Sequence, residues 1–516
     1  MLISIGLSCE FSIYMHFPRS SGILLHPTSF PSRFGIGDLG GEAYKFIDFL
    51  AQSNQQFWQI LPLGPTGYGN SPYSCYSAMA GNPLLLSPEK LQDEGLLTDE
   101  DFANLPDFSL DKVDYERVIQ TKRALLRKAC DRFKANISPE RQAEFTKFCV
   151  AKASWLDDYA LFMALHRSFG DTSWYEWEPE IAHFQPEAVQ EWREKLSDEI
   201  YYRKFLQFEF YRQWSALKQY ANDRYIQIIG DIPIYVAHNS ADVWAHRDIF
   251  TIDEETGAAA LMAGVPPDYF SQTGQLWGNP VYKWDKLQEN NYQWWVERFQ
   301  ATFEYVDIVR IDHFLGFEAY WQVEMGETTA INGQWVKGPG AEFFQAIKEE
   351  LGDLPIIAED LGLVTPAVLA LRDKFEFPGM KILHFAFGGD SDNPYLPFNI
   401  DRNCVIYTGT HDNNTTVGWF NQIQDHEREN AIRYLGCIGE EGIHWALIRL
   451  ALSSIANLAI IPLQDILGLG EEAQMNRPGI AQGNWDWYYR SGALTDELRD
   501  RLKTLTHIYG RKPHRS

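Results

Sequence analysis

The sequence predicts an α/β protein built as a (β/α)8 TIM barrel, and three observations support this prediction. Eight short apolar runs have the composition of strands that are buried on both faces. Helical patterns lie between several of these runs, and acidic residues follow three of them. The 516 residues suffice for one such barrel with insertions. Because the active site of this fold lies at the carboxyl ends of the strands, the three acids are expected to meet in one pocket.

The strand and helix patterns alternate along the chain in the order that a barrel requires. Strands are expected at residues 22–27, 57–63, 226–236, 306–311, 354–358, 380–385, 404–408 and 458–463. Apolar residues at helical spacing predict helices at 38–53, 341–351, 365–375, 425–435 and 495–507. The residues after the eighth strand leave no room for a C-terminal β-sandwich domain.

We expect one catalytic barrel at residues 19–516, with two insertions. Residues 1–18 start apolar but lack a basic segment and a cleavage site, which predicts a disordered extension or a start codon placed too far upstream. A charged, amphipathic stretch at about 84–223 predicts a helical insertion. Within it, Ser87-Pro88 and Ser138-Pro139 are expected helix starts, with a capping serine before proline. A substrate-loop insertion is expected at about 240–300.

Composition limits the classes of partner. The formal net charge of −25 repels phosphate backbones, which argues against nucleic acid, and no segment predicts a membrane span. The 17 Trp, 25 Tyr and 32 Phe exceed what packing usually needs, and flat aromatic faces suit the C–H faces of sugar rings. The six cysteines show no paired spacing, which predicts neither zinc nor a disulfide framework and favours the cytoplasm.

The central stretch is VDIVRIDHF at residues 306–314. Side chains alternate along a strand, so Arg310 and Asp312 point to the same side, and the arginine keeps the carboxylate ionised. By itself this pair is as compatible with a structural ion pair as with a catalytic one. Glu359 after the fifth strand and Asp412 after the seventh favour catalysis, since three acids then converge.

Glycoside cleavage is the chemistry that such acids suit best. A retaining enzyme needs an ionised carboxylate as nucleophile and a protonated carboxyl as acid. Arg310 provides the cation for Asp312, and Glu359, at the end of an apolar strand and facing two aspartates, is the expected proton donor. Asp38 and Asp360 are expected to be structural.

Long motifs across nearly the whole chain carry a family resemblance. They include SSGILLHPTSFPSRFGIGDLG, GPTGYGNSPYSCYSA, GDIPIYV, GVPPDYFSQTGQLWGNPVY, VRIDHF, IAEDLG, PGMKILHFAF, GTHDNNTTVGW and IPLQDILGLGEEAQMNRPG. The sequence resembles the amylomaltases, or 4-α-glucanotransferases, of glycoside hydrolase family 77 in the α-amylase clan. The resemblance implies transfer of an α-1,4-glucan segment to the 4-hydroxyl of glucose or of another glucan. Its substrates would be maltooligosaccharides, amylose or glycogen-type glucans, handled by a monomer or a weak homo-oligomer.

The resemblance also implies roles for the three acids. Asp312 in VRIDHF is similar to the family's nucleophile, and Arg310 to the arginine that orients it. Glu359 in IAEDLG resembles the general acid/base. Asp412 in GTHDN resembles the third acid, which grips sugar hydroxyls and stabilises the distorted ring.

Further positions resemble substrate-binding residues. Tyr73 in GNSPY and Asp231 in GDIPIYV match positions around the cleaved bond, and His411 lies beside the third acid. The stretch GVPPDYFSQTGQLWGNP resembles a mobile loop over the cleft. The residues of this loop that would contact the glucan are Asp268, Tyr269, Phe270, Gln275 and Trp277.

Other readings of these residues stay open. Trp277 could belong to the core, Tyr73 could be packing, and His313 could hold loop geometry or touch sugar. The sequence also departs from the family's usual motifs, which leaves the acceptor and chain-length preferences open. The departures are Leu315, Asn414, Gln474 and Tyr488.

The sequence leaves two alternative functions to compare, a glucan hydrolase and a non-catalytic glucan-binding protein. A hydrolase of the same clan would use water as acceptor, and a non-catalytic glucan-binding protein would not turn over sugar at all. The motif match disfavours the first and the intact acids disfavour the second. No metal or organic cofactor is expected, because the chain has no clustered Cys/His ligands, calcium-loop pattern or Gly-rich phosphate motif.

Overall fold

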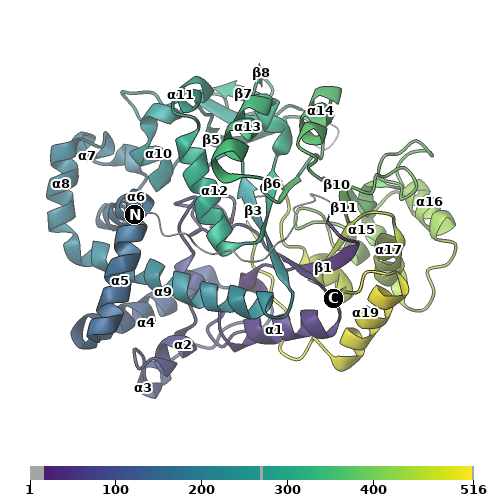
Figure 1. Ribbon diagram of the computed structural model, residues 1–516, viewed down its shortest axis with the longest axis horizontal. Coiled ribbons are helices and arrows are strands. Elements are labelled where there is room, and N and C mark those ends of the chain that lie inside the picture. The colour runs from purple at the N-terminus through teal and green to yellow at the C-terminus, as the bar shows by residue number, and fades with distance from the viewer. Residues whose placement is uncertain (1–16, 268–270, 481, 514–516) are drawn as a thin grey trace.

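Eight parallel strands form the centre of the computed structural model, which describes residues 17–267, 271–480 and 482–513 (Figure 1). Their order in the sheet is β10-β11-β12-β1-β2-β3-β6-β9, with every neighbouring pair parallel. The backbone N–H of Ala358 donates a 2.9 Å hydrogen bond to the carbonyl of Pro378, which brings β9 beside β10 and closes the ring. The predicted (β/α)8 barrel is therefore confirmed.

The barrel strands coincide with the eight apolar runs of the sequence. They are β1 (Ser20–Leu24), β2 (Phe57–Gln59), β3 (Gln227–Pro233), β6 (Ile308–Asp312), β9 (Ile356–Ala358), β10 (Gly379–Ile382), β11 (Cys404–Tyr407) and β12 (Leu458–Pro462). Every residue of β1 and β12 is buried, as expected for parallel strands covered on both faces. Gly22 is required where β1 meets β2, since a Cβ there would lie 2.4 Å from the carbonyl oxygen of Phe57.

Helices surround the barrel and fill the long connection between β2 and β3. Those of the connection are α2 (Pro88–Asp93), α3 (Asp99–Phe102), α4 (Tyr115–Asn136), α5 (Pro139–Ala151), α6 (Ala153–Ser168), α7 (Pro179–Ala182), α8 (Pro186–Lys195) and α9 (Ser197–Asn222). Both expected caps are present, because Ser87 Oγ accepts from the Lys90 N–H and Ser138 Oγ accepts from the Arg141 N–H. Figure 1 shows these helices, in blue, on one side of the barrel.

The remaining helices follow the chain around the barrel. They are α1 (Gly41–Gln52), α10 (Ala241–Ala245), α11 (Trp284–Glu289), α12 (Gln293–Tyr305), α13 (Gly340–Leu351), α14 (Pro366–Lys374), α15 (Thr416–Gln422), α16 (Asp425–Leu435), α17 (Gly442–Ser453), α18 (Leu463–Ile466) and α19 (Asp496–Ile508). All five helices predicted from apolar spacing are present to within a few residues. Within the described residues, no helix combines the length and apolar character that crossing a bilayer requires.

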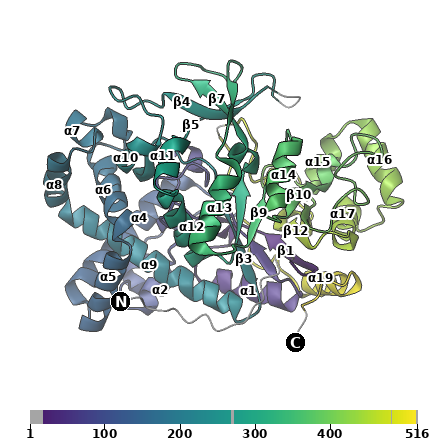
Figure 2. The same ribbon diagram turned by 45° about the horizontal axis from the view of Figure 1, so that its top comes forward.

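A second sheet was not predicted from the sequence. It is antiparallel, in the order β5-β4-β7-β8, and consists of β4 (Leu261–Val265), β5 (Gln275–Pro280), β7 (Ala319–Glu324) and β8 (Gln334–Lys337). Figure 2 shows β4, β5 and β7 together above the barrel strands. The stretch that resembles a mobile loop thus has strands at both ends. These strands were not predicted from the sequence because short strands of this kind depend on partners elsewhere in the chain.

Candidate active site

The register of the barrel brings the predicted acids to one end of neighbouring strands. In the β6–β9 pair, Ile311 lies opposite Ala358, so the next residues, Asp312 and Glu359, emerge side by side at the carboxyl end. Asp412 lies in the loop that follows β11. The catalytic face of a barrel is built from such strand ends, and the three acids therefore occupy the position expected of a site.

Arg310 connects two carboxylates at the floor of this site. Its Nη1 atom lies 2.6 Å from Oδ2 of Asp231 and 3.0 Å from Oδ1 of Asp312. The Tyr73 hydroxyl donates a 2.8 Å hydrogen bond to the same Asp231 oxygen. Burial opposes the charge of Arg310, but the two aspartates outweigh it and raise the arginine pKa well above its ordinary value. The arginine is therefore a fixed cation shared between Asp231 and Asp312.

Asp231 and Asp312 differ in their access to solvent. The Asp231 side chain is fully buried, and burial together with the charge of Asp312 raises its pKa to about 7 against the opposing effect of Arg310. The Asp312 side chain is 28% exposed while it contacts the same guanidinium. A ligand entering the site can therefore reach the Asp312 carboxylate, which is the requirement for a nucleophile.

Glu359 is held by the backbone in a buried position. The N–H of His313 donates to Oε2 at 2.6 Å, and the N–H of Leu361 donates to Oε1 at 3.0 Å. These bonds and Arg310 favour the ionised form, but burial and the neighbouring Asp312 charge outweigh them and raise the pKa of Glu359 to about 8. A carboxyl with such a pKa carries a proton at neutral pH and can act as a general acid.

His313 occupies a strained backbone position between the two acids. Its φ of 53° and ψ of 49° lie in the left-handed region, which few non-glycine residues adopt and which often marks a functional constraint. Its ring packs edge-on against Trp277, with centroids 4.8 Å apart. Burial lowers the pKa of the imidazole to about 4, so the ring is neutral. His313 therefore both sets the loop geometry and lies against the aromatic wall of the site.

The Asp412 carboxylate contacts His411, which was predicted as a site residue, and Asn476, which was not. Its Oδ2 atom lies 3.3 Å from Nε2 of His411, and its Oδ1 atom accepts a 2.6 Å hydrogen bond from Nδ2 of Asn476. The Asn476 N–H also donates to the His411 carbonyl at 3.0 Å. His411 stacks on Tyr73 with centroids 5.2 Å apart and an interplanar angle of 9°. The available signal for Asn476 was its place in the quoted motif EEAQMNRPG.

Gln275 and Trp277 come from β5 of the second sheet. Trp277 Nε1 donates to Gln275 Oε1 at 3.3 Å, and the indole is 37% exposed. Its contact with the His313 ring places it beside the acids rather than in the core, so the core alternative for Trp277 does not hold. The other three predicted ligands from this stretch lie outside the described residues. They are Asp268, Tyr269 and Phe270.

The comparison with known proteins agrees with this geometry. The sequence profile of one family, described as 4-alpha-glucanotransferase, matches residues 25–495. The chain belongs to this family. It is 57% identical to a 4-alpha-glucanotransferase of Synechocystis sp. over 96% of this chain and 98% of the relative, and 47% identical to that of Thermus thermophilus over 95% and 99%. An amylomaltase of Streptococcus agalactiae, solved in complex with acarbose, has a TM-score of 0.92 at 40% identity, covering 96% of this chain and all of that one.

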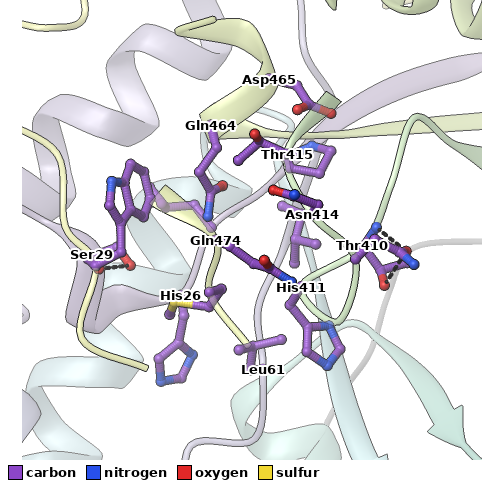
Figure 3. Close-up of a pocket in the computed structure, with 16 residues that line it drawn as sticks. His26, Ser29, Leu61, Thr410, His411, Asn414, Thr415, Gln464, Asp465 and Gln474 are labelled. Carbon is purple, nitrogen blue, oxygen red and sulfur yellow. Dashed lines mark hydrogen bonds between the residues drawn. The ribbon is translucent and has the colours of Figure 1, made fainter. Parts of the chain in front are cut away.

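His411 also lines a pocket of mixed polar and apolar character, and two of the sequence departures, Asn414 and Gln474, line it as well (Figure 3). Asn414 Nδ2 donates to Gln422 Oε1 at 2.9 Å. Gln474 Nε2 donates at 2.9 Å to the carbonyl of Asn476, the residue that holds Asp412. Both departures therefore lie near the segment that holds the third acid, and within the described part of the chain neither side chain forms a hydrogen bond with the Asp412 carboxylate.

The other two departures lie in different surroundings. Leu315 is buried in the short 3-10 turn Phe314–Phe317, which follows β6. The Tyr488 hydroxyl donates to the carbonyl of Ser109 in the inserted region.

Asp360, which was expected to be structural, accepts hydrogen bonds from the Met380 N–H at 2.7 Å and from Arg372 at 2.5 Å. It therefore ties β9 to β10 and to α14.

Proposed function

We propose that this 4-alpha-glucanotransferase acts by double displacement, with Asp312 as nucleophile and Glu359 as general acid and base. In the first step, an Asp312 oxygen attacks C1 of the donor sugar as the bond from C1 to the leaving 4-oxygen breaks. The Glu359 proton moves to that oxygen, which leaves a glycosyl ester on Asp312 and an ionised Glu359. The observation that carries the proposal is the contrast between the two acids, because Asp312 is partly exposed and paired with Arg310 whereas Glu359 is buried with a raised pKa.

The second step reverses the first with a new sugar. The 4-hydroxyl of the acceptor gives its proton to Glu359 while its oxygen attacks C1, and the bond to Asp312 breaks. The anomeric configuration is retained because two inversions occur. Glu359 is suited to both steps, since a pKa near 8 allows it to give and regain a proton close to neutral pH.

The surrounding residues have supporting roles in this proposal. Arg310 contacts and aims the Asp312 carboxylate, and Tyr73 and Asp231 offer hydrogen-bonding groups to the sugar at the cleaved bond. Asp231 Oδ1 is buried and has no hydrogen-bond partner among the described residues, which leaves it available to a sugar hydroxyl. Asp412 and His411 would grip hydroxyls of the distorted ring.

The proposed substrates are maltooligosaccharides, amylose and glycogen-type glucans, as both donor and acceptor. Their neutral hydroxyl-rich chains suit a protein of net charge −25 with aromatic walls at its site. We expect the enzyme to act in the cytoplasm as a monomer or weak homo-oligomer. The free thiols Cys75, Cys130, Cys149, Cys404 and Cys437 fit a reducing compartment.

Incubation with maltotriose alone, followed by chromatography and a reducing-end assay, tests the proposal. Transfer should give glucose and a ladder of longer chains with almost no net gain in reducing ends. A steady gain in reducing ends without longer chains would indicate the hydrolase instead. No turnover at all would leave only glucan binding.

A further inference from the structure

Two of the 17 tryptophans are more than a third exposed, and both belong to the second sheet. Trp277 on β5 is 37% exposed and lies at the active site, whereas Trp335 on β8 is 42% exposed. An exposed indole leaves a large apolar area in water, and such exposure often marks a binding surface. The site already described explains Trp277. Trp335 takes no part in it.

Strand alternation places these two tryptophans on opposite faces of the sheet. Trp335 lies directly opposite Trp321 on β7, Trp321 opposite Gly264 on β4, and Gly264 opposite Leu276 on β5. Residues directly opposite one another share a face, so this row lies on one side and Gln275, the neighbour of Leu276, on the other. The β4–β5 register shifts just beyond Leu276, but the Trp277 indole donates to Gln275 Oε1 and therefore lies on the Gln275 side. The contact of Trp277 with His313 identifies its side as the one toward the barrel. Trp321 and Trp335 therefore face away from the acids.

The outward tryptophans form a fixed pair. Their ring centroids lie 5.4 Å apart at an interplanar angle of 70°. Trp321 Nε1 donates a 2.8 Å hydrogen bond to the carbonyl of Ala330, in the turn between β7 and β8. A Cβ at Gly333 would lie 2.2 Å from that nitrogen, so the turn closes against the indole only with glycine there. Trp321 is thus held in place before any ligand arrives and Trp335 packs against it, which reduces the entropy lost on binding.

The turn between β7 and β8, which closes against Trp321, carries polar side chains. Asn332 Nδ2 contacts the Glu327 carboxylate at 3.2 and 3.3 Å in the same turn, where Asn332 is exposed and Glu327 is partly exposed. Met325, just after β7, and Ile331, in the turn, are each about half exposed. Aromatic faces bordered by amide and carboxylate groups match a sugar chain, whose C–H faces are apolar and whose edges carry hydroxyls.

We propose that Trp335 and Trp321 form a second, non-catalytic binding site for α-1,4-glucan chains, on the face of the sheet that points away from the acids. The inference rests on the proposed function, because the same polymer would be the substrate of the site across the sheet. Consecutive glucose rings of an α-1,4-glucan turn relative to one another, so two rings inclined at 70° can each receive one. Holding a long chain there raises its local concentration at the cleft, while a trisaccharide is too short to profit.

The main alternative occupant is a second copy of this chain. The net charge of −25 opposes association of two identical surfaces, and the neutral glucan meets no such repulsion. Nucleic acid is disfavoured for the same electrostatic reason. We therefore do not propose self-association through this surface, but the experiments below can detect it.

Affinity electrophoresis in gels containing glycogen provides a direct test. The parent protein carries Glu359→Gln, so that it does not cleave the polymer during the run. Adding Trp335→Ala should weaken glycogen retention about fivefold to tenfold, the usual effect of one stacking indole, and Trp335→Phe should restore part of it. Tyr225→Ala is the matched control, since Tyr225 is 76% exposed and precedes β3 at the opposite end of the barrel. Equal retention of Trp335→Ala and its parent would overturn the proposal.

Kinetics of the otherwise wild-type enzyme separate this site from the catalytic one. Trp335→Ala should raise the KM for amylose about fivefold, leave kcat unchanged and leave maltotriose turnover within about twofold of wild type. A parallel loss on both substrates would assign Trp335 to folding or to the cleft and refute the second site. If Trp335→Ala instead splits a dimer in light scattering while retention is unchanged, the surface joins two copies. Failure of the proposed function would appear separately, as absence of wild-type maltotriose transfer.

Discussion

The backbone N–H of His313 donates a 2.6 Å hydrogen bond to Oε2 of Glu359. The residue that follows the proposed nucleophile therefore positions the proposed acid. His313 reaches this position with a φ of 53°, a left-handed conformation held by the surrounding loop. The two carboxyl groups of the proposed mechanism are consequently linked through one peptide unit, and a shift of the β6 end would displace both.

Asp312→Ala and Glu359→Gln should each reduce maltotriose turnover by several orders of magnitude, because one lacks the nucleophile and the other the proton donor. A glucosyl fluoride distinguishes them, since fluoride leaves without a proton. Glu359→Gln should still form the covalent intermediate, detectable by mass spectrometry, and Asp312→Ala should not. Equal trapping in both variants would contradict the assigned roles.

The raised pKa of Glu359 predicts a pH-dependent stability difference. Native Glu359 keeps its proton up to about pH 8, whereas the unfolded group loses it near 4.5. Stability is thus lost as pH rises through this window, by at most about 1.4 kcal/mol per pH unit. Glu359→Gln lacks this loss, so its Tm relative to wild type should increase from pH 5 to pH 8. Glu350→Gln on the exposed face of α13 should show no such trend, and parallel curves for Glu359→Gln would refute a protonated acid.

The same group should set the alkaline limit of activity. Because cleavage needs the proton on Glu359, kcat/KM should fall as pH rises through about 8. The pH profile of maltotriose transfer measures this limb. A constant rate up to pH 10 would show that another group donates the proton.

Asn476→Ala should lower kcat about tenfold to a hundredfold, because Asp412 loses the side chain that orients it. Asn476→Asp should be worse at pH 7, where two carboxylates would meet, and should partly recover at lower pH. Asn484→Ala is the control, since Asn484 supports the same segment through the Arg477 N–H without contacting Asp412. Equal losses in Asn476→Ala and Asn484→Ala would indicate a loop effect only.

Trp277→Ala should raise the ratio of hydrolysis to transfer on maltotriose. Water at about 55 M competes for the glycosyl ester, and a held acceptor can prevail through an effective molarity of roughly 10⁵ M. Loss of the indole that borders the site weakens that hold. From the sequence, Phe270→Ala is likewise predicted to raise the ratio of hydrolysis to transfer. Trp335→Ala, on the other face, should leave the ratio unchanged, and an unchanged ratio in Trp277→Ala would mean that this wall does not favour the acceptor.

Exhaustive chelation should leave activity undiminished. Arg310 already neutralises charge between Asp231 and Asp312, and in the described residues no group of three or more His, Cys, Asp or Glu side chains is arranged to hold a metal ion. The measurement is maltotriose transfer after dialysis against EDTA. A loss that only added Ca²⁺ restores would contradict the prediction.

Local patterns allowed much of the barrel and site to be predicted. Strands buried on both faces are continuous apolar runs, and caps such as Ser87-Pro88 are short-range signals, so both can be read without tertiary contacts. Arg310 and Asp312 were paired because strand alternation alone places them on one side. The second sheet was not predicted because its central pair joins β4 to β7, more than fifty residues away in the chain.

The sequence by itself determined the fold class, the family and the identity of the three acids at strand ends. Only the tertiary structure decided the charge partners, the orientation and the pKa values of those acids. The second partner of Arg310, Asp231, comes from 79 residues away, and Asn476 reaches Asp412 across 64. The raised pKa of Glu359 likewise depends on burial by distant segments and on the Asp312 charge. Desolvation and hydrogen bonding are set by the neighbours that folding assembles, and no local pattern in the chain encodes them.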